Sequence, residues 1–176
     1  MQIDSLISLD IETTGLDPER DAITEIGAVR FRGRRVEAEW STLINPGRAI
    51  PREITALTGI SNEMVSRAPR LAEVAADLKA FAGNSPVAGH NVRFDMDFLQ
   101  ARGLLSFNET IDTYDLAATL FPSAGRYNLT AVGQMLGIPL AATHRALDDA
   151  RVTHAVFVQL YERAMALPID LLAELE

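Results

Sequence analysis

The sequence predicts an α/β domain of three layers, in which helices flank a mixed five-stranded sheet. Residues 22–31 and 36–40 both read as strands and are joined by a turn at Gly33, so the sheet begins with an antiparallel hairpin. Short apolar strands then alternate with amphipathic helices along the rest of the chain. The 176 residues are enough for a full core, and we expect one domain over residues 1–176.

Each element follows from hydrophobic periodicity and from glycine or proline at its ends. The first strand lies within residues 5–16 and closes in a turn at Gly15–Pro18. The clearest helix follows Pro69, where apolar side chains recur at helical spacing up to Gly83. The remaining strands are expected at 86–89 and 110–113, and the remaining helices within 51–60 and at 94–102, 113–121, 128–136 and 146–166.

Two acidic residues, Asp10 and Glu12, lie at the end of the first strand. Alternation along a strand places both on one face, while Leu9 and Ile11 point to the other. Two partly buried carboxylates this close repel each other unless a cation neutralises them, and hard oxygen ligands suit Mg²⁺ or Mn²⁺. A lone Asp-x-Glu is also typical of a solvated strand end, so the interpretation depends on the other acidic positions.

A second acidic position lies on the helix expected at 94–102. On a helical wheel Asp95 falls between Phe98 and Leu99, which places it on the apolar face, whereas Asp97 points to solvent. An aspartate on the buried face of a helix needs a partner. We therefore predict that Asp95, and not Asp97, belongs to a functional site.

The last helix carries a third acidic position near its start. Asp149 lies on the same face of the helix as the apolar stripe that starts with Val152, because Val152 follows it by three residues. Asp148 has Arg151 as its neighbour and faces solvent. His144 precedes Asp149 by five residues, which is about 140° on a wheel of 3.6 residues per turn. His144 can therefore act with Asp149 only from the loop before the helix.

Composition and charge exclude several classes of protein. The chain has no cysteine, which excludes disulfides and thiolate metal sites and favours a reducing compartment. We find neither a signal peptide nor an apolar run as long as a membrane span, and we expect a cytoplasmic protein without membrane contact. The net charge of −8 argues against a protein that grips long duplexes, although a chain end inserted into a metal-lined cleft needs few lysines.

Taken in order, the three acidic motifs resemble the DEDDh 3′–5′ exonuclease family. The segments are LDIETTGLDP with Asp10 and Glu12, GHNVRFDMDFL with Asp95, and HRALDDA with His144 and Asp149. The similarity covers essentially the whole chain, which resembles the proofreading epsilon subunits of bacterial DNA polymerase III and their free-standing relatives. The spacing of four residues between the histidine and the last aspartate indicates the histidine subclass.

The resemblance implies an RNase H-like fold with the Asp-x-Glu strand at its centre and two divalent metal ions, Mg²⁺ or Mn²⁺. By this analogy Asp10, Glu12 and Asp149 hold the catalytic metal, and Asp10 bridges to the second ion. Asp95 binds mainly through water, and His144 is the general base. Five further residues are implied to hold the terminal nucleotide, with Leu16 wedged against its base: Thr13, Thr14, Leu16, Asn91 and Phe94.

The function implied by the resemblance is release of 5′-mononucleotides from the 3′ end of single-stranded DNA, in proofreading or repair. The alternative is an exoribonuclease of the RNase T or oligoribonuclease type. DNA is favoured, but the choice depends on contacts to the 2′-OH that a sequence does not expose. The epsilon subunits carry a further segment that tethers them to the polymerase catalytic subunit, so we expect either a catalytic fragment or an enzyme that acts without that tether.

Two other classes are less consistent with the sequence. A non-catalytic domain that only binds a partner has no need of four converging carboxylates and a histidine. A nucleotide-binding α/β protein would carry G-x-x-x-x-G-K-[ST] or G-x-G-x-x-G, and neither pattern occurs in this chain.

Overall fold

The computed structural model describes residues 5–140 and 145–168. One sheet contains the five strands of this part of the chain, in the order β3-β2-β1-β4-β5. Their bounds are β1 Leu6–Thr13, β2 Ile23–Arg32, β3 Arg35–Leu43, β4 Val87–Gly89 and β5 Thr110–Asp112. β1 pairs with β2, and β2 with β3, in antiparallel register, whereas β1–β4 and β4–β5 are parallel. The predicted mixed sheet with an N-terminal hairpin is therefore confirmed.

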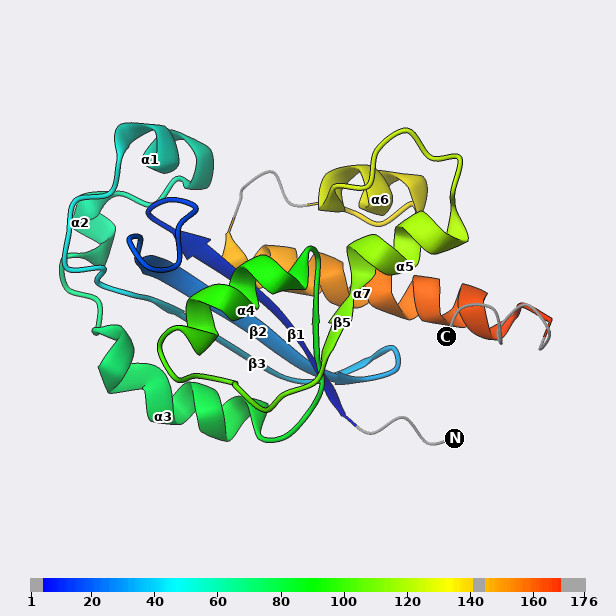
Figure 1. The fold of residues 1–176 in the computed structure, drawn as a ribbon, viewed down its shortest axis with the longest axis horizontal. Coiled ribbons are helices and arrows are strands. Elements are labelled where there is room, and N and C mark those ends of the chain that lie inside the picture. Colours follow the sequence, from blue (N-terminus) through cyan, green and yellow to red (C-terminus); the bar gives the residue numbers. More distant parts are fainter. Residues whose placement is uncertain (1–4, 141–144, 169–176) are drawn as a thin grey trace.

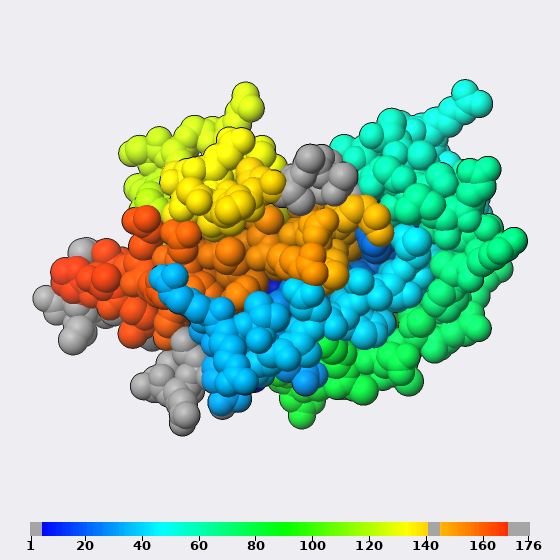
Figure 2. Space-filling model, turned by 180° about the vertical axis from the view of Figure 1, so that it is seen from behind, coloured from blue at the N-terminus to red at the C-terminus, as the bar shows by residue number. Residues whose placement is uncertain are grey.

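Helices cover both faces of this sheet (Figure 1). The helices are α1 Arg52–Thr58, α2 Asn62–Val65, α3 Leu71–Ala82, α4 Val92–Gln100, α5 Thr113–Leu120, α6 Leu129–Met135 and α7 Ala146–Met165. The side chains of α3 and α4 join the core on one face, and α7 packs on the other with α5 and α6 beside it. Seen from behind, α7 lies across its face of the sheet next to α6 (Figure 2). Within the described residues, no helix combines the length and hydropathy that a membrane crossing requires.

The central strand β1 separates two environments by simple alternation. Ile7, Leu9 and Ile11 are fully or almost fully buried in the core formed with α3 and α4. The intervening positions face α7, and at the end of the strand these are Asp10 and Glu12. An apolar strand thus delivers two carboxylates to the layer between the sheet and α7, as the alternation predicted.

Two helices differ from the expectation. The helix expected at 94–102 begins at Val92, because the backbone N–H groups of Asn91 and Val92 are bonded to the Asp112 carboxylate at 2.9 and 3.0 Å, which supports the first turn. The expectation also lacked α2, a single turn that Ser61 caps by accepting the N–H of Met64 at 3.3 Å. Four residues are too few for hydrophobic periodicity to reveal a helix.

The start of α7 lies directly against β2 at Gly27. A Cβ atom at this position would lie 2.2 Å from the Leu147 nitrogen and 2.5 Å from the Ala146 oxygen, which are backbone atoms that cannot rotate away. Gly27 is also the residue opposite Asp10 in the β1–β2 pair. The absence of a side chain therefore brings the helix that carries Asp149 close to the strand that carries Asp10.

We predict that Gly27→Ala destabilises the protein by about 1–3 kcal/mol, the usual cost of an overpacked interior position. The control is Gly125→Ala, at an exposed glycine whose added methyl group would meet nothing within 4 Å. Chemical denaturation of both variants, monitored by circular dichroism, checks the prediction. Equal stability of the two variants would show that α7 adjusts freely above β2.

Candidate active site

Three carboxylates from two elements meet between the sheet and α7. Asp10 and Glu12 come from β1, and Asp149 comes from the first turn of α7. One carboxylate oxygen of each lies within 4.8 Å of those of the other two. This is a separation at which one hard cation can be shared by all three. The structure thus brings together three of the four carboxylates that the sequence assigned to a metal site.

Burial and mutual repulsion make this cluster unfavourable when all its members are charged. The pKa of Asp10 is raised well above its ordinary value by burial and then by the nearby Asp95 and Asp149. The pKa of Glu12 is raised to about 8, first by burial and then by Asp149, and Arg145 only partly opposes this rise. A divalent cation removes the repulsion, and the all-oxygen donor set fits Mg²⁺ or Mn²⁺ better than a softer metal. The residues present therefore fit the predicted divalent metal.

Asp95, on α4, approaches β1 near Asp10. Its Oδ1 accepts the backbone N–H of Ile11 at 2.9 Å, and its side chain is 3 % exposed. β4 ends at Gly89 while β1 continues to Thr13, so this N–H group has no partner strand and the carboxylate takes its place. Burial raises the pKa of Asp95 to about 8, although the bond from Ile11 works against the rise. The predicted inward orientation of Asp95 and the outward orientation of Asp97 are both confirmed.

The strand end after β1 is a compact turn with an apolar tip. Thr13 donates to the Gly15 carbonyl at 2.5 Å, and Thr14 donates to Asp21 at 3.1 Å and accepts the Ala22 N–H at 3.0 Å. Both threonines are buried and use their hydroxyl groups to brace the turn. Leu16, at the tip, is 82 % exposed. An apolar side chain held in solvent four residues after Glu12 is available to contact a ligand.

Asn91 and Phe94 lie at the start of α4. Asn91 is exposed and has the left-handed conformation (φ 61°, ψ 47°), and Phe94 is half-buried with its ring 5.1 Å from that of Phe98. Their assignment to nucleotide binding stays a prediction.

His144 lies outside the described residues, and α7 begins at Ala146, two residues after it. Asp148 bonds to Arg151 at 2.9 Å, as its outward position on the wheel predicted.

Sequence reasoning missed two polar contacts around the site. Glu25 on β2 is 4 % exposed and bonds to Arg145, and its signal was a charged residue inside the apolar segment ITEIGAV. His90 bonds through Nδ1 to Thr113 Oγ1 at 2.9 Å and through Nε2 to the Tyr127 carbonyl at 2.6 Å. Burial lowers the pKa of His90, so the neutral ring fastens the segment between α5 and α6 to the end of β4. No local pattern reveals either contact, because each joins residues far apart in the chain.

A cluster of carboxylates on a mixed sheet of this kind is the arrangement in which nucleases hold divalent metals, and comparison with known proteins identifies the family. A family model described as "Exonuclease" matches residues 7–157. The chain therefore belongs to the exonuclease family, and the resemblance seen in the sequence is confirmed.

Two curated relatives carry the name of DNA polymerase III. The chain is 38 % identical over 160 residues to the DNA polymerase III subunit epsilon of Treponema pallidum, covering 87 % of this chain and 74 % of the relative. It is 40 % identical over 177 residues to the PolC-type DNA polymerase III of Thermotoga maritima, covering 98 % of this chain. The chain spans 13 % of the length of that polymerase.

Solved structures agree on the fold. Exonuclease X in complex with 5′ overhanging duplex DNA matches with a TM-score of 0.77 at 26 % identity, covering 92 % of this chain and 94 % of that one. An exonuclease I from Methylocaldum szegediense matches equally well, at 25 % identity over 92 % of this chain and 41 % of that one. The predicted RNase H-like arrangement, with the Asp-x-Glu strand at the centre of the sheet, is confirmed.

The raised pKa values predict how the stability of the metal-free protein depends on pH. The folded protein keeps protons on Glu12 and Asp95 up to about pH 8, whereas an unfolded chain releases them near pH 4. The free energy of unfolding contributed by these groups is therefore fully present below about pH 4 and is lost as the pH rises to 8. In EDTA, the melting temperature should be lower at pH 8 than at pH 6.

Asp10→Asn removes one repelling charge, so it should raise the melting temperature at pH 8. It should also abolish most of the increase in melting temperature caused by added Mn²⁺.

Differential scanning calorimetry of wild type and Asp10→Asn, with EDTA or with Mn²⁺, checks both effects. Asp97→Asn serves as the control, because Asp97 is exposed and should alter neither. An Asp10→Asn protein that melts below wild type in EDTA at pH 8 would show that the carboxylates do not strain the metal-free fold.

Proposed function

We propose that the chain is a metal-dependent 3′–5′ exonuclease that hydrolyses the last phosphodiester bond of single-stranded DNA and releases 5′-mononucleotides. The observation that carries this proposal is the convergence of Asp10, Glu12 and Asp149 within 4.8 Å, with Asp95 beside them, in a member of the exonuclease family. The same chemistry on RNA 3′ ends remains the alternative. DNA is supported by the curated relatives, which are named as DNA polymerase III subunits.

The four carboxylates are proposed to hold two divalent ions, Mg²⁺ or Mn²⁺. Asp10, Glu12 and Asp149, whose oxygens lie within 4.8 Å of one another, would hold the catalytic ion. Asp10 would also help to hold the second ion, and Asp95, which accepts the N–H of Ile11, would bind mainly through water. When bound, such ions neutralise the charge on the attacking and leaving oxygens of the phosphodiester. The chain's own contribution is to hold four negative groups in fixed positions on a strand and two helices.

His144 is proposed to take the proton from the attacking water. It lies outside the described residues, two positions before Ala146, at which α7 begins, and five before Asp149. An imidazole with an ordinary pKa near 6.5 accepts a proton well around neutral pH. Only the neutral ring can act as a base, so the rate should rise with pH as the histidine loses its proton.

The terminal nucleotide is proposed to lie between the β1 turn and the start of α4. Leu16 offers an exposed apolar side chain for the base, and Asn91 and Phe94 line the start of α4. Thr13 and Thr14 act by holding the turn in place, because their hydroxyl groups are already bonded within it.

We further propose that the protein works in the cytoplasm with a DNA polymerase catalytic subunit, as the name of the epsilon relative suggests.

A direct assay tests the reaction. Single-stranded DNA and RNA of equal sequence, labelled at the 5′ or the 3′ end, are digested side by side with Mg²⁺, with Mn²⁺ and with EDTA. The expected result is stepwise shortening from the 3′ end, release of 5′-mononucleotides, faster digestion of DNA and no digestion in EDTA. Cutting of a circular single strand, or undiminished activity in EDTA, would contradict the proposal, and faster digestion of RNA would select the alternative.

Paired variants test which carboxylates act. Asp149→Ala should abolish activity, because its oxygen lies with those of Asp10 and Glu12, whereas Asp148→Ala should keep most of it. Asp95→Ala and Asp97→Ala should differ in the same way. Steady-state rates of the four purified variants measure the effect. Equal losses within either pair would show that the orientation of that helix does not decide which carboxylate is used.

A further inference from the structure

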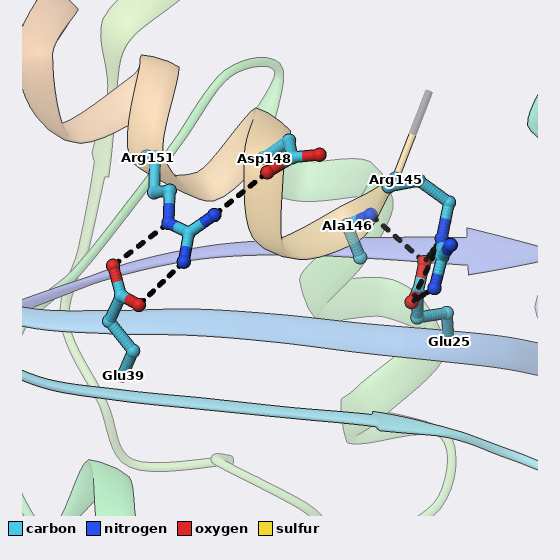
Figure 3. A network of polar contacts seen from close by, with 6 residues as sticks. All are labelled: Glu25, Glu39, Arg145, Ala146, Asp148 and Arg151. Atoms are coloured by element: carbon cyan, nitrogen blue, oxygen red, sulfur yellow. Dashed lines mark hydrogen bonds and ion pairs between the residues drawn. The ribbon is translucent and has the colours of Figure 1, made fainter. Parts of the chain in front are cut away.

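A buried carboxylate that belongs to none of the motifs lies beside the start of α7. Glu25 on β2 accepts bonds from Arg145 Nε at 2.9 Å and from Arg145 Nη2 at 2.6 Å, so that the two side chains form a two-pronged pair. The Glu25 Oε2 atom also accepts the backbone N–H of Ala146 at 3.1 Å. Figure 3 shows both groups reaching the same carboxylate from the first residues of the helix.

This carboxylate supplies a cap that the helix itself does not have. Arg145 is the residue before the first turn of α7, in extended conformation, and its side chain makes no capping hydrogen bond. The N–H of Ala146 would otherwise lack an intrahelical acceptor. A negative charge at a helix N-terminus is favourable by itself, and here it is also paired with arginine. Glu25 therefore fixes where α7 begins.

The start of α7 is linked to Asp149 by one backbone hydrogen bond. The carbonyl of Arg145 accepts the N–H of Asp149 at 3.0 Å, so Asp149 lies one hydrogen bond away from the residue held by Glu25. On the sheet, Glu25 is the residue opposite Glu12 in the β1–β2 register. The two strands and the helix thus form a closed loop of contacts in which the metal-site carboxylates from β1 and α7 are linked through Glu25.

A second ion pair between α7 and the sheet provides a comparison. Arg151 bonds to Glu39 on β3 with Nε at 2.9 Å and Nη2 at 2.7 Å, in the same two-pronged manner. Glu39 is exposed, and the pair lies further along the helix (Figure 3). Both pairs attach α7 to the sheet, and Arg151 also bonds to the Asp148 side chain at 2.9 Å. Of the two glutamates, Glu25 is the one that accepts a backbone N–H at the start of the helix, that of Ala146.

We propose that Glu25 and Arg145 are positioning residues, which set the start of α7 so that Asp149 meets Asp10 and Glu12. This inference rests on the proposed exonuclease function where it concerns turnover, and on the metal site alone where it concerns metal binding. Neither residue contacts the reacting atoms in this assignment.

The test compares Glu25→Gln with the matched control Glu39→Gln. Each change removes the charge of a glutamate paired with an arginine of α7, at almost unchanged volume. Mn²⁺ binding in the absence of nucleic acid is measured by the electron paramagnetic resonance of free Mn²⁺, and kcat and KM are measured on labelled single-stranded DNA. Glu25→Gln should weaken Mn²⁺ binding or lower kcat by about 10- to 100-fold, the usual effect of losing a group that orients metal ligands, with KM nearly unchanged. Glu39→Gln should stay within about twofold of wild type, as expected of an exposed ion pair.

Arg145→Lys provides a second variant in case Glu25→Gln does not fold. It keeps the charge but cannot form the planar two-pronged contact, so it should show a smaller loss of the same kind. The double variant Glu25→Gln/Arg145→Lys should be no worse than the more impaired single variant, because both changes break one interaction.

The outcomes separate this inference from the proposed function. If wild type digests DNA and Glu25→Gln matches Glu39→Gln in Mn²⁺ binding and in kcat, the positioning role is wrong and the function stands. If Arg145→Lys raises KM at unchanged kcat, Arg145 contacts the nucleic acid instead, and the inference is overturned. If wild type binds Mn²⁺ but digests neither DNA nor RNA, the proposed function fails, and the comparison of Mn²⁺ binding still decides the positioning role.

Discussion

The repulsion among carboxylates at the end of β1 is the constraint on which the rest of the structure depends. Asp10, Glu12 and Asp149 place oxygens within 4.8 Å of one another in a partly buried layer. Two unit charges at this separation repel by about 3 kcal/mol at an effective dielectric constant of about 20. The raised pKa values of Asp10 and Glu12 express the same repulsion, in addition to the larger effect of burial. A chain free to move would separate these groups, so the fold must hold them.

The fold holds each carboxylate through contacts with the backbone, which is less free to move than a side chain. β1 is the central strand, paired with β2 from Leu6 to Thr13 and with β4 at Ile7 and Ser8, so the backbone that carries Asp10 and Glu12 is held in the sheet. The close approach at Gly27 and the cap from Glu25 fix α7 over the sheet. Asp95 is fixed by the buried N–H of Ile11, which β4 does not reach because it is shorter than β1. Such rigid support is what a metal site needs if its ligands are to be ready before the metal binds.

The relatives place the same unit in proteins of different sizes. The match to Exonuclease X covers 94 % of that chain, whereas the match to the PolC-type polymerase covers 13 % of a much longer protein. All the carboxylates described above, together with Glu25 and Arg145, lie inside residues 7–157, the range of the family match. Among the described residues, the contacts that build the carboxylate cluster therefore lie within the range that matches the family.

The sequence by itself determined the order of the strands and helices and the inward-facing member of each acidic pair. Strand alternation placed Asp10 and Glu12 on one face, and helical periodicity selected Asp95 over Asp97, because both periods are properties of the local chain. Only the tertiary structure decided which group stabilises which carboxylate. The bond from Ile11 to Asp95 depends on where a neighbouring strand ends, and the bond from Arg145 to Glu25 depends on the register of β2 and the packing of α7. These contacts join residues 84 and 120 positions apart, and no local pattern in the sequence encodes such a distance.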